Sequence, residues 1–171
     1  RAAGQGRLKQ CIGYWCFSQY WNQEEMCQVA RSLNGQSIYL AEQKDWPLLK
    51  RYGLVCALAG SHWFDQGMNN PKYHDMCLGK MRAAIDACAD FGFPNVISFT
   101  GLAEGIALDE GIKHCVAGYK RIMGYAEKKK VNICLEILNS RVPVEMVGVP
   151  GYQGDHTDYC MEIVKQEFHT R

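Results

Sequence analysis

This sequence has no long hydrophobic run and no excess of charge of either sign. No apolar stretch approaches the roughly 18 residues needed to cross a bilayer, and residues 1–10 lack the apolar centre of a signal peptide. A net charge of +1 gives no field that would attract nucleic acid. The one basic run, Lys128–Lys130, is expected to close a helix, where cations favour the dipole. We therefore expect a soluble, single-domain protein that binds neither nucleic acid nor a membrane.

Cysteine is abundant but lacks the spacing of metal sites and disulfide frameworks. The nine cysteines include no Cys-x-x-Cys pair, and their odd number disfavours full pairing. Most fall within predicted helices and strands, so we expect buried free thiols in a reducing compartment, the cytoplasm. The alternative is the periplasm, if Arg1–Gly6 is the remnant of a removed export signal.

The apolar pattern predicts five strands that alternate with five helices. The strands are expected at residues 8–17, 37–41, 54–59, 95–100 and 131–138. The helices are expected at residues 23–33, 46–51, 71–91, 109–130 and 155–166, the last of them capped by Asp155. Strict alternation implies a parallel sheet, either in a doubly wound fold or in an eight-stranded barrel.

The ends of the predicted strands favour the barrel. Residues 16–20 lack the Gly-x-Gly-x-x-Gly pattern that follows the first strand of a dinucleotide-binding fold. Polar residues instead follow later strands, with His62 after the third, Thr100 at the fourth and Asn139 after the fifth. Such a polar rim is typical of a barrel whose active site is built from strand ends.

The clearest functional candidate is Glu136, an acid near the end of the apolar segment 131–138. A carboxylate in a strand that is buried on both faces is costly unless a cation, a metal or hydrogen bonds compensate it. The segment that follows, residues 140–155, has the glycine, proline and polar residues of a long binding loop. We therefore predict a catalytic or metal-binding role for Glu136.

Two segments near this acid are the most specific in the sequence. Leu135–Arg141 reads Leu-Glu-Ile-Leu-Asn-Ser-Arg, and Pro150–Asp155 reads Pro-Gly-Tyr-Gln-Gly-Asp. They resemble the Glu-x-x-Asn-x-Arg segment and the Pro-x-Tyr loop of the hydroxypyruvate isomerase branch of the xylose isomerase-like barrels. That superfamily also contains sugar epimerases and an apurinic endonuclease. Further segments agree in order with these barrels: Asp45–Pro47, Ala57–His62, Met68–Pro71 and Phe99–Gly101.

The resemblance implies an incomplete (β/α)8 TIM barrel over residues 8–166. Residues 1–7 are then a disordered extension, and residues 167–171 are a tail that does not belong to the family. The family continues into a sixth strand with an Asp-x-x-His element and two further β-α units, which this sequence does not contain. We therefore expect three of the eight strands to be missing.

The activity implied by the resemblance is isomerisation of hydroxypyruvate to tartronate semialdehyde, or of a similar small keto-acid or sugar. A divalent ion, Mg²⁺ or Mn²⁺, would assist proton transfer through an enediolate. Glu136 would be a metal ligand and a possible base. The other ligands, including a second glutamate, belong to strands six to eight of the family, so we expect metal affinity and turnover of this chain to be close to nil.

Three further residues are predicted to bind substrate. Arg141 can clamp a carboxylate through two hydrogen bonds, unless it forms a salt bridge with Glu145 or another loop acid. His62 is expected to contact substrate or metal, unless it is an exposed loop histidine. Asn139 is placed beside them by its position on the rim.

Other polar and aromatic residues have competing structural interpretations. Glu42 can line the cavity, or it can pair with Lys44. Asp155 and His156 are expected to serve only as a helix cap and a surface residue. The aromatic group after the first strand is expected to pack rather than to bind substrate: Tyr14, Trp15, Phe17, Tyr20 and Trp21.

Two alternatives compete with the isomerase hypothesis. The chain can be a non-catalytic half-barrel that self-associates through its open strand edges, or that requires a missing C-terminal half. A DNA-repair endonuclease would need several histidine ligands and a basic groove, and the sequence offers neither.

Overall fold

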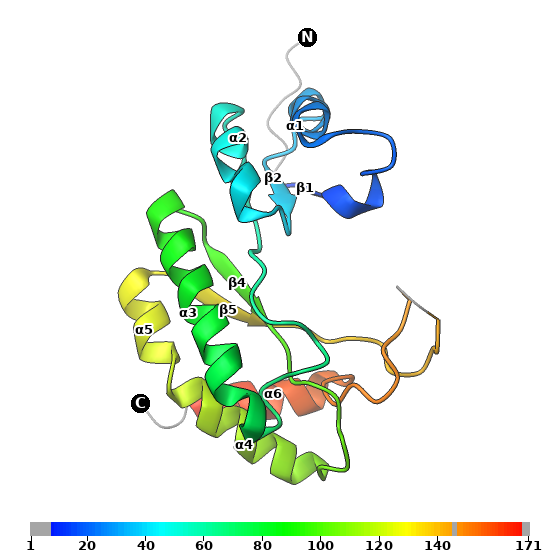
Figure 1. The fold of residues 1–171 in the computed structure, drawn as a ribbon, viewed down its shortest axis with the longest axis vertical. Coiled ribbons are helices and arrows are strands. Elements are labelled where there is room, and N and C mark those ends of the chain that lie inside the picture. The colour runs from blue at the N-terminus through cyan, green and yellow to red at the C-terminus, as the bar shows by residue number, and fades with distance from the viewer. Residues whose placement is uncertain (1–7, 145–146, 169–171) are drawn as a thin grey trace.

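The computed structural model describes residues 8–144 and 147–168, which form a curved row of short strands with helices along it (Figure 1). The strands are β1 (Cys11–Gly13), β2 (Ser37–Tyr39), β3 (Val55–Cys56), β4 (Asn95–Ser98) and β5 (Asn132–Leu135). The helices are α1 (Gln23–Ser32), α2 (Trp46–Arg51), α3 (His74–Phe91), α4 (Leu108–Lys120), α5 (Met123–Lys129) and α6 (Thr157–Phe168). Short 3-10 turns are η1 (Tyr14–Cys16), η2 (Gln43–Asp45) and η3 (Pro71–Tyr73).

All strand pairs in the described residues are parallel and follow the order of the chain. β1 pairs with β2 and β2 with β3, while β4 pairs with β5 in a second ladder. A parallel bridge between Ala59 and Val96 joins the two ladders. This is the topology of consecutive β-α units, so the predicted fold class, an incomplete α/β barrel, is confirmed.

The strands are shorter than the sequence predicted, most of all at β1. The predicted strand over residues 8–17 is wrong after Gly13, because η1 turns the chain and the Phe17 N–H donates to the Tyr14 carbonyl at 2.9 Å. β2 ends at Tyr39 because Leu40 adopts a left-handed conformation, with φ of 52°. That conformation cannot continue a strand.

The single helix predicted over residues 109–130 is wrong, because two helices occupy this range. The N–H groups of Arg121 and Ile122 donate three residues back, to Gly118 at 3.1 Å and Tyr119 at 2.9 Å, which tightens the end of α4. Ile122 is fully buried between the two helices. The charge pattern is preserved, since α5 ends with Lys128 and Lys129 in its last turn as predicted.

Two apolar clusters lie on opposite faces of the strands. The main core packs the helices against one face and includes Ile38 and Val96. A small cluster of Ile97, Phe99 and Tyr152 lies on the other face, which we call the inner face. Because successive strand residues point to opposite sides, Val96 and Ile97 belong to different clusters.

Local signals fix two of the helix ends. The Asn22 side chain accepts hydrogen bonds from the N–H groups of Glu24 and Glu25, and the Glu25 carboxylate accepts one from the Asn22 N–H, which is a complete capping box for α1. Helix α3 ends at Gly92 in a left-handed conformation, with φ of 68°.

Within the described ranges, no helix combines the length and apolar character of a membrane span.

The predicted terminal segments lie partly outside the described residues. Residues 1–7, predicted to be a disordered extension, are outside them, as are residues 169–171. Helix α6 continues through Phe168, two residues into the predicted tail.

Candidate functional site

Glu136 directly follows β5 and lies on the inner face. Leu135 packs into the main core, so the alternation of a strand directs its neighbour Glu136 to the opposite face. The Glu136 N–H donates to the Ser98 carbonyl at 3.0 Å, and the Glu136 carbonyl accepts from the Tyr152 hydroxyl at 2.9 Å. Both main-chain groups of Glu136 are therefore held in place.

The Glu136 carboxylate is half-buried and has no hydrogen-bond or ion-pair partner among residues 8–144 and 147–168. Burial raises its pKa above the usual range of glutamate, because the charged form loses hydration. The expectation of a strand buried on both faces is wrong, since β5 is exposed at Asn132 and half-buried at Ile133–Leu135. An unpaired carboxylate with a raised pKa is suited to accept a proton.

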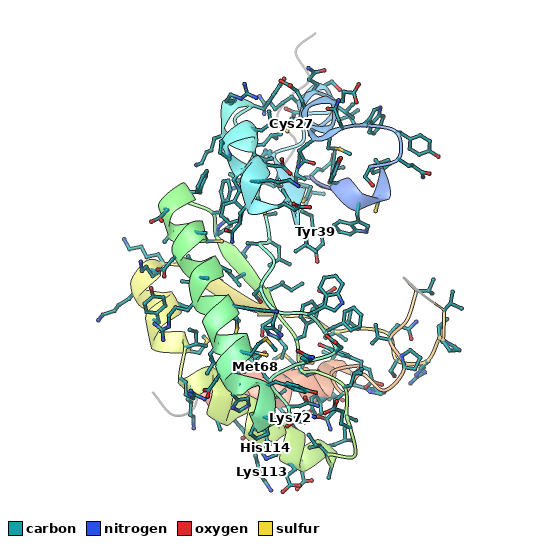
Figure 2. All side chains as sticks on the ribbon, in the orientation of Figure 1. Cys27, Tyr39, Met68, Lys72, Lys113 and His114 are labelled. Carbon is teal, nitrogen blue, oxygen red and sulfur yellow. The ribbon has the colours of Figure 1, made fainter. Side chains whose placement is uncertain are left out.

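Tyr39 is a second titratable group on the inner face, and the sequence analysis missed it. Its neighbour Ile38 is fully buried in the main core, so Tyr39 points the other way. Burial raises the pKa of Tyr39, and the negative charge of Glu136 raises it further. Figure 2 shows Tyr39 at the end of β2, on the side away from α1. The Trp15 ring packs on it at 5.1 Å between centroids.

His62 lies beneath the strand ends rather than on an exposed loop. It is 1% exposed; its Nδ1 lies 3.1 Å from the carbonyls of Trp63 and Gln66, and its Nε2 lies 2.9 Å from the Ser98 hydroxyl. Carbonyls only accept, so Nδ1 carries the proton and Nε2 accepts from Ser98. Burial lowers the pKa of His62, which keeps the ring neutral. The exposed-loop alternative is wrong, and substrate contact stays a prediction.

Asn139 and Arg141 lie in the loop that follows β5, and both are exposed. The Asn139 side chain accepts from the Arg141 N–H at 2.9 Å and donates to the Val147 carbonyl at 3.3 Å. It therefore shapes the loop that carries Arg141. The Arg141 guanidinium has no partner within the part of the chain that the structure describes, and the alternative partner Glu145 lies outside that part.

Glu42 takes its predicted structural role. Its carboxylate forms an ion pair with Lys44 at 2.7 Å, and both side chains are 71% exposed. An exposed pair of this kind contributes little to stability. Nothing in this arrangement directs Glu42 to the inner face.

Asp155 departs from its predicted role, whereas His156 is the surface residue that was expected. Helix α6 begins at Thr157, and the Asp155 carboxylate accepts hydrogen bonds from Ser140 and His156, so the predicted cap is wrong. The ring of His156 remains largely exposed. This cluster forms part of a separate pocket, described below.

The aromatic group after β1 is partly a packing cluster, as expected. Phe17 stacks on Trp21 with centroids 5.4 Å apart, and Trp15 covers Tyr39. Tyr20 is 70% exposed.

The described residues do not fit a metal ion. Within residues 8–144 and 147–168, no three His, Cys, Asp or Glu side chains are arranged to hold one. Glu136 is a single carboxylate, whereas divalent cations are held by several oxygen or nitrogen ligands.

Comparison of sequences finds no relative, whereas comparison of folds does. No family model matches the sequence, and no curated protein is significantly similar to it. The fold is similar to an AP endonuclease, family 2, from Brucella melitensis, with a TM-score of 0.73 and 14% identity over 94% of this chain and 65% of that one. It is also similar to the IolI protein with a binding zinc atom, with a TM-score of 0.72 and 14% identity over 94% and 59%.

A third similar structure is a D-tagatose 3-epimerase-like protein, with a TM-score of 0.69 and 16% identity over 92% of this chain and 60% of that one. The chain thus spans 59% to 65% of the length of these three structures. At identities this low, the structural similarity concerns the fold alone. It confirms the fold that the resemblance implied. The chain therefore has the fold of an incomplete xylose isomerase-like TIM barrel.

Proposed function

We propose that the whole protein is an isomerase or epimerase of small sugars or keto-acids, and that this chain supplies its strand-five acid, Glu136. The observation that carries the proposal is the unpartnered, half-buried carboxylate at the end of β5, whose pKa is raised by burial. Similar structures described as epimerases support this class of reaction.

The specific reaction proposed is that of hydroxypyruvate. Glu136 removes a proton from C3, which gives an enediolate across C2 and C3. The proton then returns to C2 while the C3 hydroxyl proton passes to the C2 oxygen, and the product is the isomer tartronate semialdehyde. A base works best when its pKa approaches the working pH, so the raised pKa of Glu136 favours this role.

The predicted binding residues have distinct parts in this proposal. Arg141, whose backbone is tied to Asn139, pairs with the substrate carboxylate. His62 contacts substrate only if its bond to Ser98 opens, because both ring nitrogens are occupied. These roles rest on the family resemblance.

A divalent ion, Mg²⁺ or Mn²⁺, belongs to the proposal for the whole barrel only. The IolI structure is described with a zinc atom, which supports a metal in proteins of this fold. Because the described residues of this chain do not form a metal site, none of the steps above passes through one.

The test is proton exchange at C3 of hydroxypyruvate in D₂O, followed by proton NMR. We expect the chain to exchange these protons above the spontaneous rate, and Glu136→Gln to lose this excess by about a hundredfold or more. Glu42→Gln, an exposed acid of the same type, is the control and should exchange normally. Equal exchange by Glu136→Gln would remove Glu136 from the proposal.

Net conversion to tartronate semialdehyde is measured in the same samples. The proposal expects it to be close to nil with or without MnCl₂, because this chain offers one acid only. A manganese-dependent turnover by the chain would contradict that expectation.

The second candidate is a non-catalytic half-barrel that self-associates, or that requires a missing C-terminal half. It is favoured by β5, which is only half-buried and has a far edge that pairs with no strand among the described residues. Unpaired edges are templates for pairing with another chain. The DNA-repair alternative gains only a shared fold from the AP endonuclease, because the described residues contain no cluster of metal-binding histidines.

A further inference from the structure

A pocket lies between the loops that follow β4 and β5. It has a volume of about 390 Å³, and its lining includes Leu108, Ser140, Asp155, His156 and Tyr159. Small-molecule sites have volumes of about 300 to 1,000 Å³. Glu136 does not line this pocket, so it is separate from the candidate carboxylate on the inner face.

The polar wall of the pocket is built around Asp155. One carboxylate oxygen accepts a hydrogen bond from the Ser140 hydroxyl, and the other accepts from Nδ1 of His156. Burial alone would raise the pKa of Asp155, but these hydrogen bonds outweigh it and lower the pKa. Asp155 is therefore an ionised acceptor, which fixes both neighbours.

The hydrogen bonds around Asp155 decide what the pocket offers to a ligand. Because Nδ1 of His156 donates to Asp155, Nε2 carries the lone pair in the neutral form of the ring, and it has no partner within the described residues. The Ser140 hydroxyl donates its hydrogen bond to Asp155, and its oxygen keeps lone pairs that can accept one. The wall thus presents acceptors, which call for a ligand that donates hydrogen bonds.

The floor of the pocket is rigid. Gln153 is 3% exposed, and its Oε1 accepts from the Asn69 amide at 2.8 Å and from the Tyr159 hydroxyl at 2.9 Å. Its Nε2 donates to the Ile106 carbonyl at 2.9 Å. These bonds tie together the loops after β3, β4 and β5, and a floor organised before binding reduces the entropy lost on binding.

Charge and polarity narrow the ligand class. Among the described residues that line the pocket, none is lysine or arginine, and Asp155 is an acid. An anion is therefore disfavoured. Each oxygen of Asp155 already accepts one hydrogen bond, so a protonated amine would share this carboxylate with Ser140 and His156. Leu108 offers an apolar surface to C–H groups.

We propose that this pocket binds an uncharged polyhydroxylated molecule the size of a monosaccharide, with a ligand hydroxyl donating to Nε2 of His156. The site is independent of the reaction proposed for Glu136.

The test is a titration of the intact chain with D-fructose and D-glucose, with the His156 imidazole signal followed by NMR. The five histidines of the chain are told apart by the signal that His156→Gln removes. We expect a saturable shift of the His156 signal with at least one of the two sugars. Ser140→Ala should weaken binding about tenfold, because it removes the hydroxyl oxygen that accepts a hydrogen bond from the ligand.

Two further variants keep the test decisive. Leu108→Asp, at a side chain that is 62% exposed, should abolish binding without affecting folding. Glu136→Gln should bind as the parent chain does, since Glu136 does not line the pocket. A shift that never saturates, binding that survives Leu108→Asp, or tighter binding of the anion hydroxypyruvate or the cation ethanolamine would overturn the proposal.

Discussion

At the scale of single residues, Glu136 destabilises the folded chain when it is ionised. Its pKa is higher in the folded chain than in the unfolded one, so folding favours the protonated form. This favourable contribution is fully present at pH values below the unfolded pKa. The contribution is lost as the pH rises through the folded pKa. Above the folded pKa the carboxylate is charged in both states, and its burial lowers the free energy of unfolding.

Glu136→Gln should therefore be more stable than the parent chain at neutral pH, because glutamine carries no charge there. The difference should shrink and disappear as the pH falls below about 4, where the parent carboxyl is protonated in both states. Urea unfolding of both chains across this range measures it. Glu42→Gln, which loses an exposed ion pair, should show no such gain. A Gln variant that is less stable at neutral pH would mean that the Glu136 carboxylate has a partner.

Sequence patterns predicted the role of Glu136, but they did not predict the place of Tyr39 or the burial of His62. Glu136 was predictable because an acid at the end of an apolar segment is conspicuous. Tyr39 was not, because a strand of three residues shows too little alternation to assign its faces. The burial of His62 depends on Ser98 and Phe99, which follow about forty residues later in the chain.

At the scale of helices, substitution by alanine is expected to have opposite effects on stability at two glycines. A Cβ on Gly111 in α4 would lie 2.1 Å from Oε1 of Gln153 and 2.6 Å from the Tyr159 hydroxyl. Gly111→Ala should therefore destabilise the chain by about 1 to 3 kcal/mol and distort the pocket floor. Gly79 in α3 is exposed and has nothing within 4 Å of the added atom.

Gly79→Ala should accordingly stabilise the chain by about 0.5 to 1 kcal/mol, because alanine is the better helix former. Denaturant unfolding of both variants gives the comparison. If Gly111→Ala were as stable as Gly79→Ala, α4 and the loop before α6 could not be packed as described.

Element order was easier to predict than element ends. Short apolar segments and amphipathic helices gave the alternation that the structure confirms. The division between α4 and α5 was missed because Arg121 and Ile122 continue the helical pattern, and the turn there depends on Ile122 entering the core. Strand ends were overestimated because apolar residues such as Leu40 pack on the inner face without belonging to a ladder.

At the scale of the whole molecule, the open row of strands predicts self-association. Exposed apolar side chains gather beyond β5, where Ile137, Val144 and Val147 are 44%, 53% and 57% exposed. Exposed apolar side chains near an unpaired edge favour contact with another copy. We expect the average mass in sedimentation equilibrium to rise with concentration.

The substitution Ile137→Lys should shift this equilibrium toward the monomer, since a charge beside the edge opposes pairing. Leu33→Lys changes a residue that is 63% exposed at the end of α1, on another element, and is the matched control. A chain that stays monomeric at every concentration, or that responds equally to both variants, would contradict association through β5.

The cysteines give this fold a set of internal chemical reporters. All are free, and burial raises the pKa of thiols such as Cys27 and Cys56 to about 11, which suppresses their reaction with alkylating reagents. Six fully buried thiols are spread over five elements: Cys27 in α1, Cys56 in β3, Cys77 and Cys88 in α3, Cys115 in α4 and Cys160 in α6. The rate at which each becomes labelled therefore measures how often its own element opens, so one alkylation time course would map local unfolding along the chain without any introduced label.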